Sequence, residues 1–145
     1  MTEVMWDGSQ DDPLQCTLRE ILDESIGIAG VLVATIEGLL VAGEFDATAA
    51  VASYDEAETI AAMAASTVGL GQQFSSRLAL GSSTGSIVQS SSGCLAVQRV
   101  GETGVLVLFG GDGLNVARLN LSVRQALPRV RDVLVGMGLS ESPSA

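Results

Sequence analysis

Apolar residues recur at helical spacing near the start of the chain. Asp12-Pro13 opens this stretch, because aspartate is a favoured N-cap and proline suits the first helical position. Gln15, three residues after the cap, is expected to complete a capping box. Gly27 predicts the end of the helix. The predicted buried face consists of Leu14, Leu18, Ile21 and Leu22.

A near-continuous apolar run from Val31 to Ile36 follows, with glycines on both sides. The run is too short for a helix, so it predicts a central strand that is covered on both faces. Glu37-Gly38 is typical of a two-residue hairpin turn in which glycine supplies a positive φ. We therefore expect residues 39–42 to return as the second strand of a hairpin.

A long helix is predicted in the middle of the chain, from Asp55 to about Arg77, after a small-residue linker at 46–53. Asp55 and Glu58 have the spacing of a capping box at its start. One side of this helix carries large apolar residues and is expected to face the protein's own core. These residues are Ile60, Met63, Thr67, Leu70, Phe74 and Leu78.

The other side of the same helix is small and uncharged. A helix face in contact only with water normally carries charges, and none occurs between Glu58 and Arg77. Small side chains let another backbone approach closely, so we favour a partner-binding or dimer-binding surface. The alternative is that a loop of the same chain covers this side. The residues of the predicted surface are Ala61, Ala62, Ala65, Ser66, Gly69, Gln72, Gln73 and Ser76.

Three apolar stretches joined by short connections predict an antiparallel meander over residues 84–90, 94–100 and 104–109. A last amphipathic helix is expected over 114–137. The order α-β-β-α-β-β-β-α favours an α+β fold, a five-stranded antiparallel sheet sandwiched by three helices. We interpret residues 12–138 as one domain between a flexible acidic tail at 1–11 and a flexible tail at 139–145.

The amino-acid composition excludes most kinds of catalytic site. All seven basic residues are arginines, and the 145 residues include neither lysine nor histidine. A Walker-type phosphate loop, a Ser-His-Asp triad and histidine-ligated zinc are therefore excluded. Carboxylates remain, but paired acids such as Asp23 and Glu24 are adjacent in sequence and point apart on a helix. We expect no enzymatic activity, no metal site and no cofactor.

Two glycine-rich segments have a superficial likeness to phosphate loops. Residues 81–86 lack lysine and lead into a strand, so we interpret them as a turn. Residues 110–113 do precede a helix, but the carboxylate of Asp112 disfavours an anion there.

The formal net charge of −10 is unevenly distributed, since residues 1–58 hold thirteen acidic residues and one basic residue. The acidic balance and an aromatic content of 3% argue against a nucleic-acid partner. The longest apolar stretches are about half of the roughly 20 residues that a membrane helix needs, so no membrane insertion is expected. Two isolated cysteines, Cys16 and Cys94, and the lack of a signal-peptide pattern favour a cytoplasmic location.

Several short motifs, in this order and spacing, resemble the Roadblock/LC7 family. The resemblance covers residues 14–137. It includes IEGLLVA at 36–42, ETIAAMAA at 58–65, LAVQRVG at 95–101 and Asn115-x-x-Arg118 before the last helix. The resemblance implies a homodimer that binds and regulates a small Ras-like GTPase. In that family the middle helices of two protomers commonly pair, an edge strand can extend the sheet across the dimer, and the GTPase sits over the helix pair.

An arginine near the predicted surface is a further candidate. Some GTPase activators supply an arginine finger, and Arg77 and Arg99 are the exposed candidates here. Arg77 ends the same helix and is a possible GTPase contact, although the resemblance itself implies no finger. The alternative is that both are ordinary surface arginines.

Two other functions stay open at this point. The same dimer can act as a scaffold that bridges signalling or motor partners without altering nucleotide turnover. The fold can also serve as a small-molecule sensor, which needs a pocket with converging polar groups.

Overall fold

The computed structural model of the chain describes residues 12–51 and 53–138. The predicted tails at 1–11 and 139–145 lie outside the described residues. The elements are, in order, α1 (Pro13–Glu24), β1 (Gly30–Thr35), β2 (Leu40–Phe45), α2 (Tyr54–Arg77), β3 (Gly85–Ser90), β4 (Gly93–Val100), β5 (Gly104–Gly110) and α3 (Val116–Gly136).

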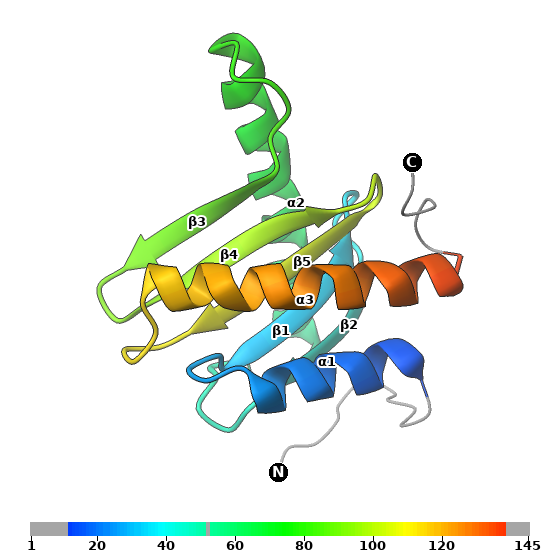
Figure 1. The fold of residues 1–145 in the computed structure, drawn as a ribbon, viewed down its shortest axis with the longest axis vertical. Coiled ribbons are helices and arrows are strands. Elements are labelled where there is room, and N and C mark those ends of the chain that lie inside the picture. Colours follow the sequence, from blue (N-terminus) through cyan, green and yellow to red (C-terminus); the bar gives the residue numbers. More distant parts are fainter. Residues whose placement is uncertain (1–11, 52, 139–145) are drawn as a thin grey trace.

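The five strands form one antiparallel sheet in the order β2-β1-β5-β4-β3. α1 and α3 lie side by side on one face of the sheet, and α2 crosses the opposite face (Figure 1). The first hairpin and the three-stranded meander are joined through the pairing of β1 with β5. The predicted α+β fold, with three helices around a five-stranded antiparallel sheet, is confirmed.

β1 supplies side chains to both hydrophobic cores. Val31 and Val33 belong to the core under α1 and α3, whereas Leu32 and Ala34 belong to the core under α2. Successive side chains of a strand point to opposite faces, so neither face of this strand meets water. The predicted strand with cover on both sides is therefore confirmed.

β1 ends at Thr35 and β2 begins at Leu40, so residues 36–39 separate the strands and the predicted two-residue turn is wrong. Gly38 in this loop does have the expected positive φ, +97°. The strand that follows runs to Phe45, three residues beyond the predicted end. The extension arises because the last residues of β2 pair with the first residues of β1, Phe45 opposite Gly30.

The first two helices begin with side-chain caps. Asp12 caps α1 as predicted, since its carboxylate accepts a hydrogen bond from the backbone N–H of Leu14 at 2.9 Å. The predicted cap of α2, Asp55, is wrong. The hydroxyl of Ser53 accepts a hydrogen bond from the backbone N–H of Glu56 at 3.1 Å, so the cap lies two residues before the predicted one. Asp55 lies within the first turn, where its charge favours the positive end of the helix.

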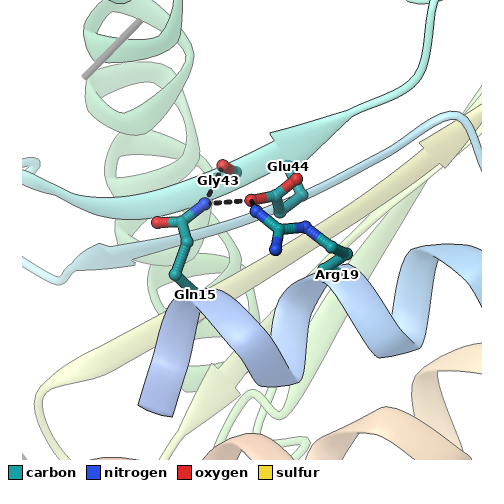
Figure 2. Close-up of polar contacts among 4 residues, drawn as sticks. All are labelled: Gln15, Arg19, Gly43 and Glu44. Atoms are coloured by element: carbon teal, nitrogen blue, oxygen red, sulfur yellow. Dashed lines mark hydrogen bonds and ion pairs between the residues drawn. The ribbon is translucent and has the colours of Figure 1, made fainter. Parts of the chain in front are cut away.

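A buried polar contact fastens α1 to β2 (Figure 2). Gln15 is only 5% exposed, and its amide donates to the carbonyl of Gly43 at 2.8 Å and to the carboxylate of Glu44. The guanidinium of Arg19 lies 3.2 Å from the same carboxylate. The predicted capping box of Gln15 with Asp12 is therefore wrong, because the glutamine side chain points to the sheet.

Candidate partner-binding surface

α2 is longer than the sheet that it crosses. Its 24 residues correspond to about 36 Å of helix. Five strands at their usual spacing are only about 20 Å wide. Gly71 still lies beside β3, because a Cβ added to it would be 3.4 Å from the Ser86 hydroxyl. The last turns of α2 extend past the sheet (Figure 1).

The side of α2 that faces the sheet consists of alanines. Ala57, Ala61 and Ala64 are buried in the core that α2 shares with the sheet. Their small side chains let the helix axis approach the strands closely. The predicted core side is therefore wrong for its largest members, which are exposed: Met63 by 62%, Leu70 by 57%, Phe74 by 59% and Leu78 by 62%.

We call the residues Ile60, Met63, Thr67, Leu70 and Phe74, with Leu78 after the last turn, the apolar stripe of α2. Helical spacing identified the stripe correctly as one side of the helix. Spacing does not reveal what the stripe faces, because a stripe that packs on another chain has the same period as one that packs on the protein's own sheet.

The small-residue side divides into a covered part and an open part. Ala61 is fully buried, so it is unavailable to a partner, and its assignment to the partner-binding surface is corrected. A Cβ on Gly38 would lie 3.4 Å from the Cα of Ala62 and 3.7 Å from the Cβ of Ala65. The β1–β2 turn of the same chain thus lies beside this part of the helix, where Ala65 is half-buried but Ala62 stays exposed, so the alternative interpretation holds only in part.

The open part lies further along α2. Ser66, Gly69, Gln73 and Ser76 are exposed, and a Cβ on Gly69 would meet no atom within 4 Å. Gln72 is half-buried, and its side-chain oxygen accepts a hydrogen bond from the backbone N–H of Ser83 at 3.1 Å, which ties the loop after α2 to the helix.

The two candidate arginines differ in their surroundings. Arg77 is exposed at the end of α2. Arg99 is half-buried on β4, where its backbone N–H donates to the carbonyl of Thr84 at 3.1 Å. Only Arg77 shares an element with the open small-residue side.

A groove of about 610 Å³ lies between α2 and the sheet. From the helix it is lined by Ile60, Met63 and Thr67, and from the sheet by side chains that include Val88 and Leu95. The lining is mainly apolar, with a serine run at 90–92 along one part. The sequence did not reveal this groove, because it is formed by residues from four separated segments.

The groove adjoins a free sheet edge. β3 pairs with β4 on one side only, so its other side has no strand partner within the described residues. Val88 on this strand is 41% exposed and Ile87 37%. An edge strand with unpaired backbone groups can pair with another chain. The apolar stripe, the groove and the free edge therefore form one continuous surface.

Comparisons with known proteins agree with this architecture. No protein-family model and no curated protein matches the sequence. An MglB with a tetrameric arrangement has a TM-score of 0.76 at 19% identity, with 94% of this chain and 98% of that chain covered. The gliding protein MglB from Thermus thermophilus has a TM-score of 0.75 at 18% identity, with the same coverage of 94% and 98%. A Roadblock/LC7 domain from Streptomyces avermitilis has a TM-score of 0.73 at 19% identity, over 83% of this chain and 97% of that chain.

The chain has the Roadblock/LC7 fold. Both glycine-rich segments contain turns, and in the second the Leu114 N–H donates to the Gly111 carbonyl at 3.0 Å. Gly81 has a φ of +91° in the turn between α2 and β3. The N-cap of α3 is Asn115, whose side chain accepts a hydrogen bond from the Arg118 N–H at 2.8 Å.

In this Roadblock/LC7 fold, residues 12–51 and 53–138 contain no group of three or more histidine, cysteine, aspartate or glutamate residues placed to hold a metal ion. Among the helices of that same part of the chain, none combines the length and apolar character needed to cross a membrane.

Proposed function

We propose that the chain is a non-enzymatic regulatory subunit that forms a homodimer and binds a small Ras-like GTPase, whose GTP hydrolysis or nucleotide exchange it modulates. The Roadblock/LC7 fold and the motif resemblance support this proposal. The single observation that carries it is the apolar stripe of α2, whose large side chains Met63, Leu70, Phe74 and Leu78 are exposed.

The dimer is the first part of the proposal. Exposed apolar side chains in a contiguous patch usually mark an interaction site. The last turns of α2 extend past the chain's own sheet and expose apolar side chains. The groove beside β3 is also lined mainly by apolar residues, so the two surfaces are chemically alike. A second copy placed with its β3 edge against the first brings each stripe over the other chain's groove. An MglB with a tetrameric arrangement is among the similar structures, which supports self-association.

GTPase binding is the second part. We assign it to the open small-residue side of α2, with Ser66, Gly69, Gln73 and Ser76 as contacts and Arg77 as a possible contact at its end. Ala62, Ala65 and Gln72 border this surface and support it through the turn at Gly38 and the loop after α2. Regulation then acts by holding the GTPase's own switch segments in one conformation. We place the protein in the cytoplasm, where protein thiols stay reduced.

One observation favours a second candidate function. The groove has a volume of about 610 Å³, within the range of small-molecule pockets. A sensor would use it for an apolar ligand, and a ligand bound there would compete with dimer formation.

The experiment combines two measurements. Sedimentation equilibrium of the chain alone should give a dimer. A small Ras-like GTPase encoded beside the chain in its genome is then assayed for GTP hydrolysis and nucleotide release, with and without the chain. A changed rate supports the regulator, binding without a changed rate supports the scaffold, and the lack of binding overturns the proposal. A ligand that raises the melting temperature while lowering the dimer fraction supports the sensor.

A further inference from the structure

Edge strand β3 is open on the face of the sheet opposite α2. On that face α1 lies over β1 and β2, and α3 lies over β4 and β5 (Figure 1). Ile87 of β3 points to the same face, because it is paired with Ala96, a member of the core under α1 and α3. The Ile87 side chain is nevertheless exposed, so neither helix covers it.

α1 and α3 lie side by side on this face, and an arginine joins them. The guanidinium of Arg129 on α3 lies 2.7 Å from the carboxylate of Glu20 and 2.9 Å from that of Glu24. The two acids are four residues apart, so they occupy the same side of α1. One flank of α3 thus holds the acidic side of a neighbouring helix through an arginine.

The other flank of α3 carries two arginines, Arg124 and Arg131. Seven residues separate them, which is two helical turns, so they point the same way about 10 Å apart. Both lie about 140–160° around the helix axis from Arg129, on the flank that faces β3. Arg124 is exposed and Arg131 is half-buried, and within residues 12–51 and 53–138 neither forms an ion pair.

We propose that this flank of α3, with Arg124 and Arg131, and Ile87 on the open strand together form a docking surface for an acidic amphipathic helix of a second protein partner. The helix lies beside α3 over β3, as α1 lies beside α3 on the other flank. Its carboxylates pair with the two arginines, and its apolar side chains contact Ile87. Arginine suits this task because its planar guanidinium can bind a carboxylate through two hydrogen bonds.

The distribution of charge favours a narrow protein helix over a flat anionic membrane. The acids of α1, Glu20, Asp23 and Glu24, are exposed on the same face of the sheet as the arginines. A membrane surface that reached Arg124 and Arg131 would also meet these acids, whereas a single helix over β3 lies on the far side of α3 from them.

This surface goes beyond the proposed GTPase regulation, since it lies on the opposite face of the sheet from α2 (Figure 1). Pairing of β3 with a second copy uses the backbone edge of the strand and leaves this face open. The acidic helix and the GTPase can therefore bind the same chain at the same time.

The experiment measures peptide binding to the full chain by fluorescence anisotropy, with no GTPase present. The probe is a fluorescein-labelled helical peptide of about 20 residues, with rows of leucine and glutamate on one side. A matched peptide has glutamine in place of glutamate. The glutamate peptide should bind at least about tenfold more tightly than the glutamine peptide, and the difference should shrink in high salt.

Charge variants test the arginines directly. Arg124→Glu with Arg131→Glu should weaken binding of the glutamate peptide at least about tenfold, since two attractions become two repulsions. Arg118→Glu is the matched control, because Arg118 is exposed on the flank beside α1, next to Gly27. It should leave the affinity unchanged, and circular dichroism should confirm that all variants are folded.

Apolar contact is tested separately. Ile87→Ser should weaken both peptides by about threefold, because it removes apolar surface without changing charge. Ile26→Ser, at an exposed apolar residue in the loop after α1, should have no effect. Gly69→Arg, on the opposite face, should bind the glutamate peptide as the wild type does.

Three results would overturn the proposal. The first is equal affinity for the two peptides, and the second is an equal effect of Arg118→Glu and the double arginine variant. The third is binding to vesicles of phosphatidylserine and phosphatidylcholine, lost in the double variant, without peptide binding, which would assign the arginines to a membrane. A monomeric chain, or one that binds no GTPase, would refute the proposed function but leave this inference standing.

Discussion

Gly38 and Ala62 are in close contact between the β1–β2 turn and α2. A Cβ added to Gly38 would lie 3.4 Å from the Ala62 Cα, and the glycine has a φ of +97°. An added Cβ would be at ordinary contact distance, so the constraint on this residue is its positive φ. The contact is how the hairpin supports the long helix that carries the candidate surface.

Gly38→Ala should lower the free energy of unfolding by about 1–2 kcal/mol, because alanine is strained at positive φ. Chemical denaturation monitored by circular dichroism measures the change. Gly136→Ala is the control, since an added Cβ there meets open space at the end of α3. Equal stability losses in the two variants would contradict the role of the turn.

Gln15→Leu should lower the free energy of unfolding by about 1–3 kcal/mol. The leucine has a similar size but leaves the Gly43 carbonyl and the Glu44 carboxylate without the amide donor. Gln125→Leu, on the exposed side of α3, should change stability by less than about 0.5 kcal/mol. Denaturant midpoints of the two variants should therefore separate, and coincident midpoints would show that the buried amide is dispensable.

Ala61→Leu should destabilise the fold by about 1–3 kcal/mol, because the larger side chain has no space between α2 and the sheet. Ser66→Leu, further along the helix on the exposed side, should have little effect. Thermal unfolding followed by circular dichroism compares them. A stable Ala61→Leu chain would mean that α2 does not rest on its alanines.

Phe74→Asp should weaken self-association by at least about tenfold, since a charge would replace an exposed ring in the apolar stripe. The circular-dichroism spectrum should not change, because the ring contributes little to the protein's own core. Gln73→Asp introduces the same charge on the neighbouring position outside the stripe and serves as the control. Sedimentation equilibrium that gives identical constants for both variants would argue against the stripe as the dimer surface.

Gly69→Arg should abolish binding of the GTPase while leaving the dimer and the fold intact. A side chain at this position has open space around it and lies on the side of α2 away from the stripe. Gly113→Arg, also in open space but before α3, is the matched control. Pull-down or fluorescence titration with the GTPase checks the result, and wild-type affinity of Gly69→Arg would remove this side of α2 from the proposed site.

The strands and their order along the chain were predictable because short-range rules decide them. The run 31–36 is almost entirely apolar, and a strand covered on both faces needs that pattern. Gly38 and Asp12 likewise perform backbone tasks that few residue types can perform. These features depend on neighbours in sequence, and the structure confirms each of them.

The orientation of α2 was not predictable from its period. α2 has three alanines on one side and large apolar residues on the next, and either side could pack on its own sheet. The large side chains can face the sheet only if the helix axis lies far enough from the strands to leave room for them. Gln15 was misjudged for a related reason, since its hydrogen-bond partner Gly43 is distant in sequence. The length of α2 does predict an overhang, because about 36 Å of helix cannot lie entirely on the sheet that it crosses, which is about 20 Å wide.

The last turns of α2 have a consequence for local stability. No sheet lies beneath them, and an isolated helical segment of this size is marginal in water. Their amide protons should therefore exchange with solvent through local opening, while those of β1 and β5 exchange only when the whole domain unfolds. Amide exchange rates in this one segment would then report assembly directly. Exchange would be fast in a monomer and slow wherever another protein surface packs against the helix.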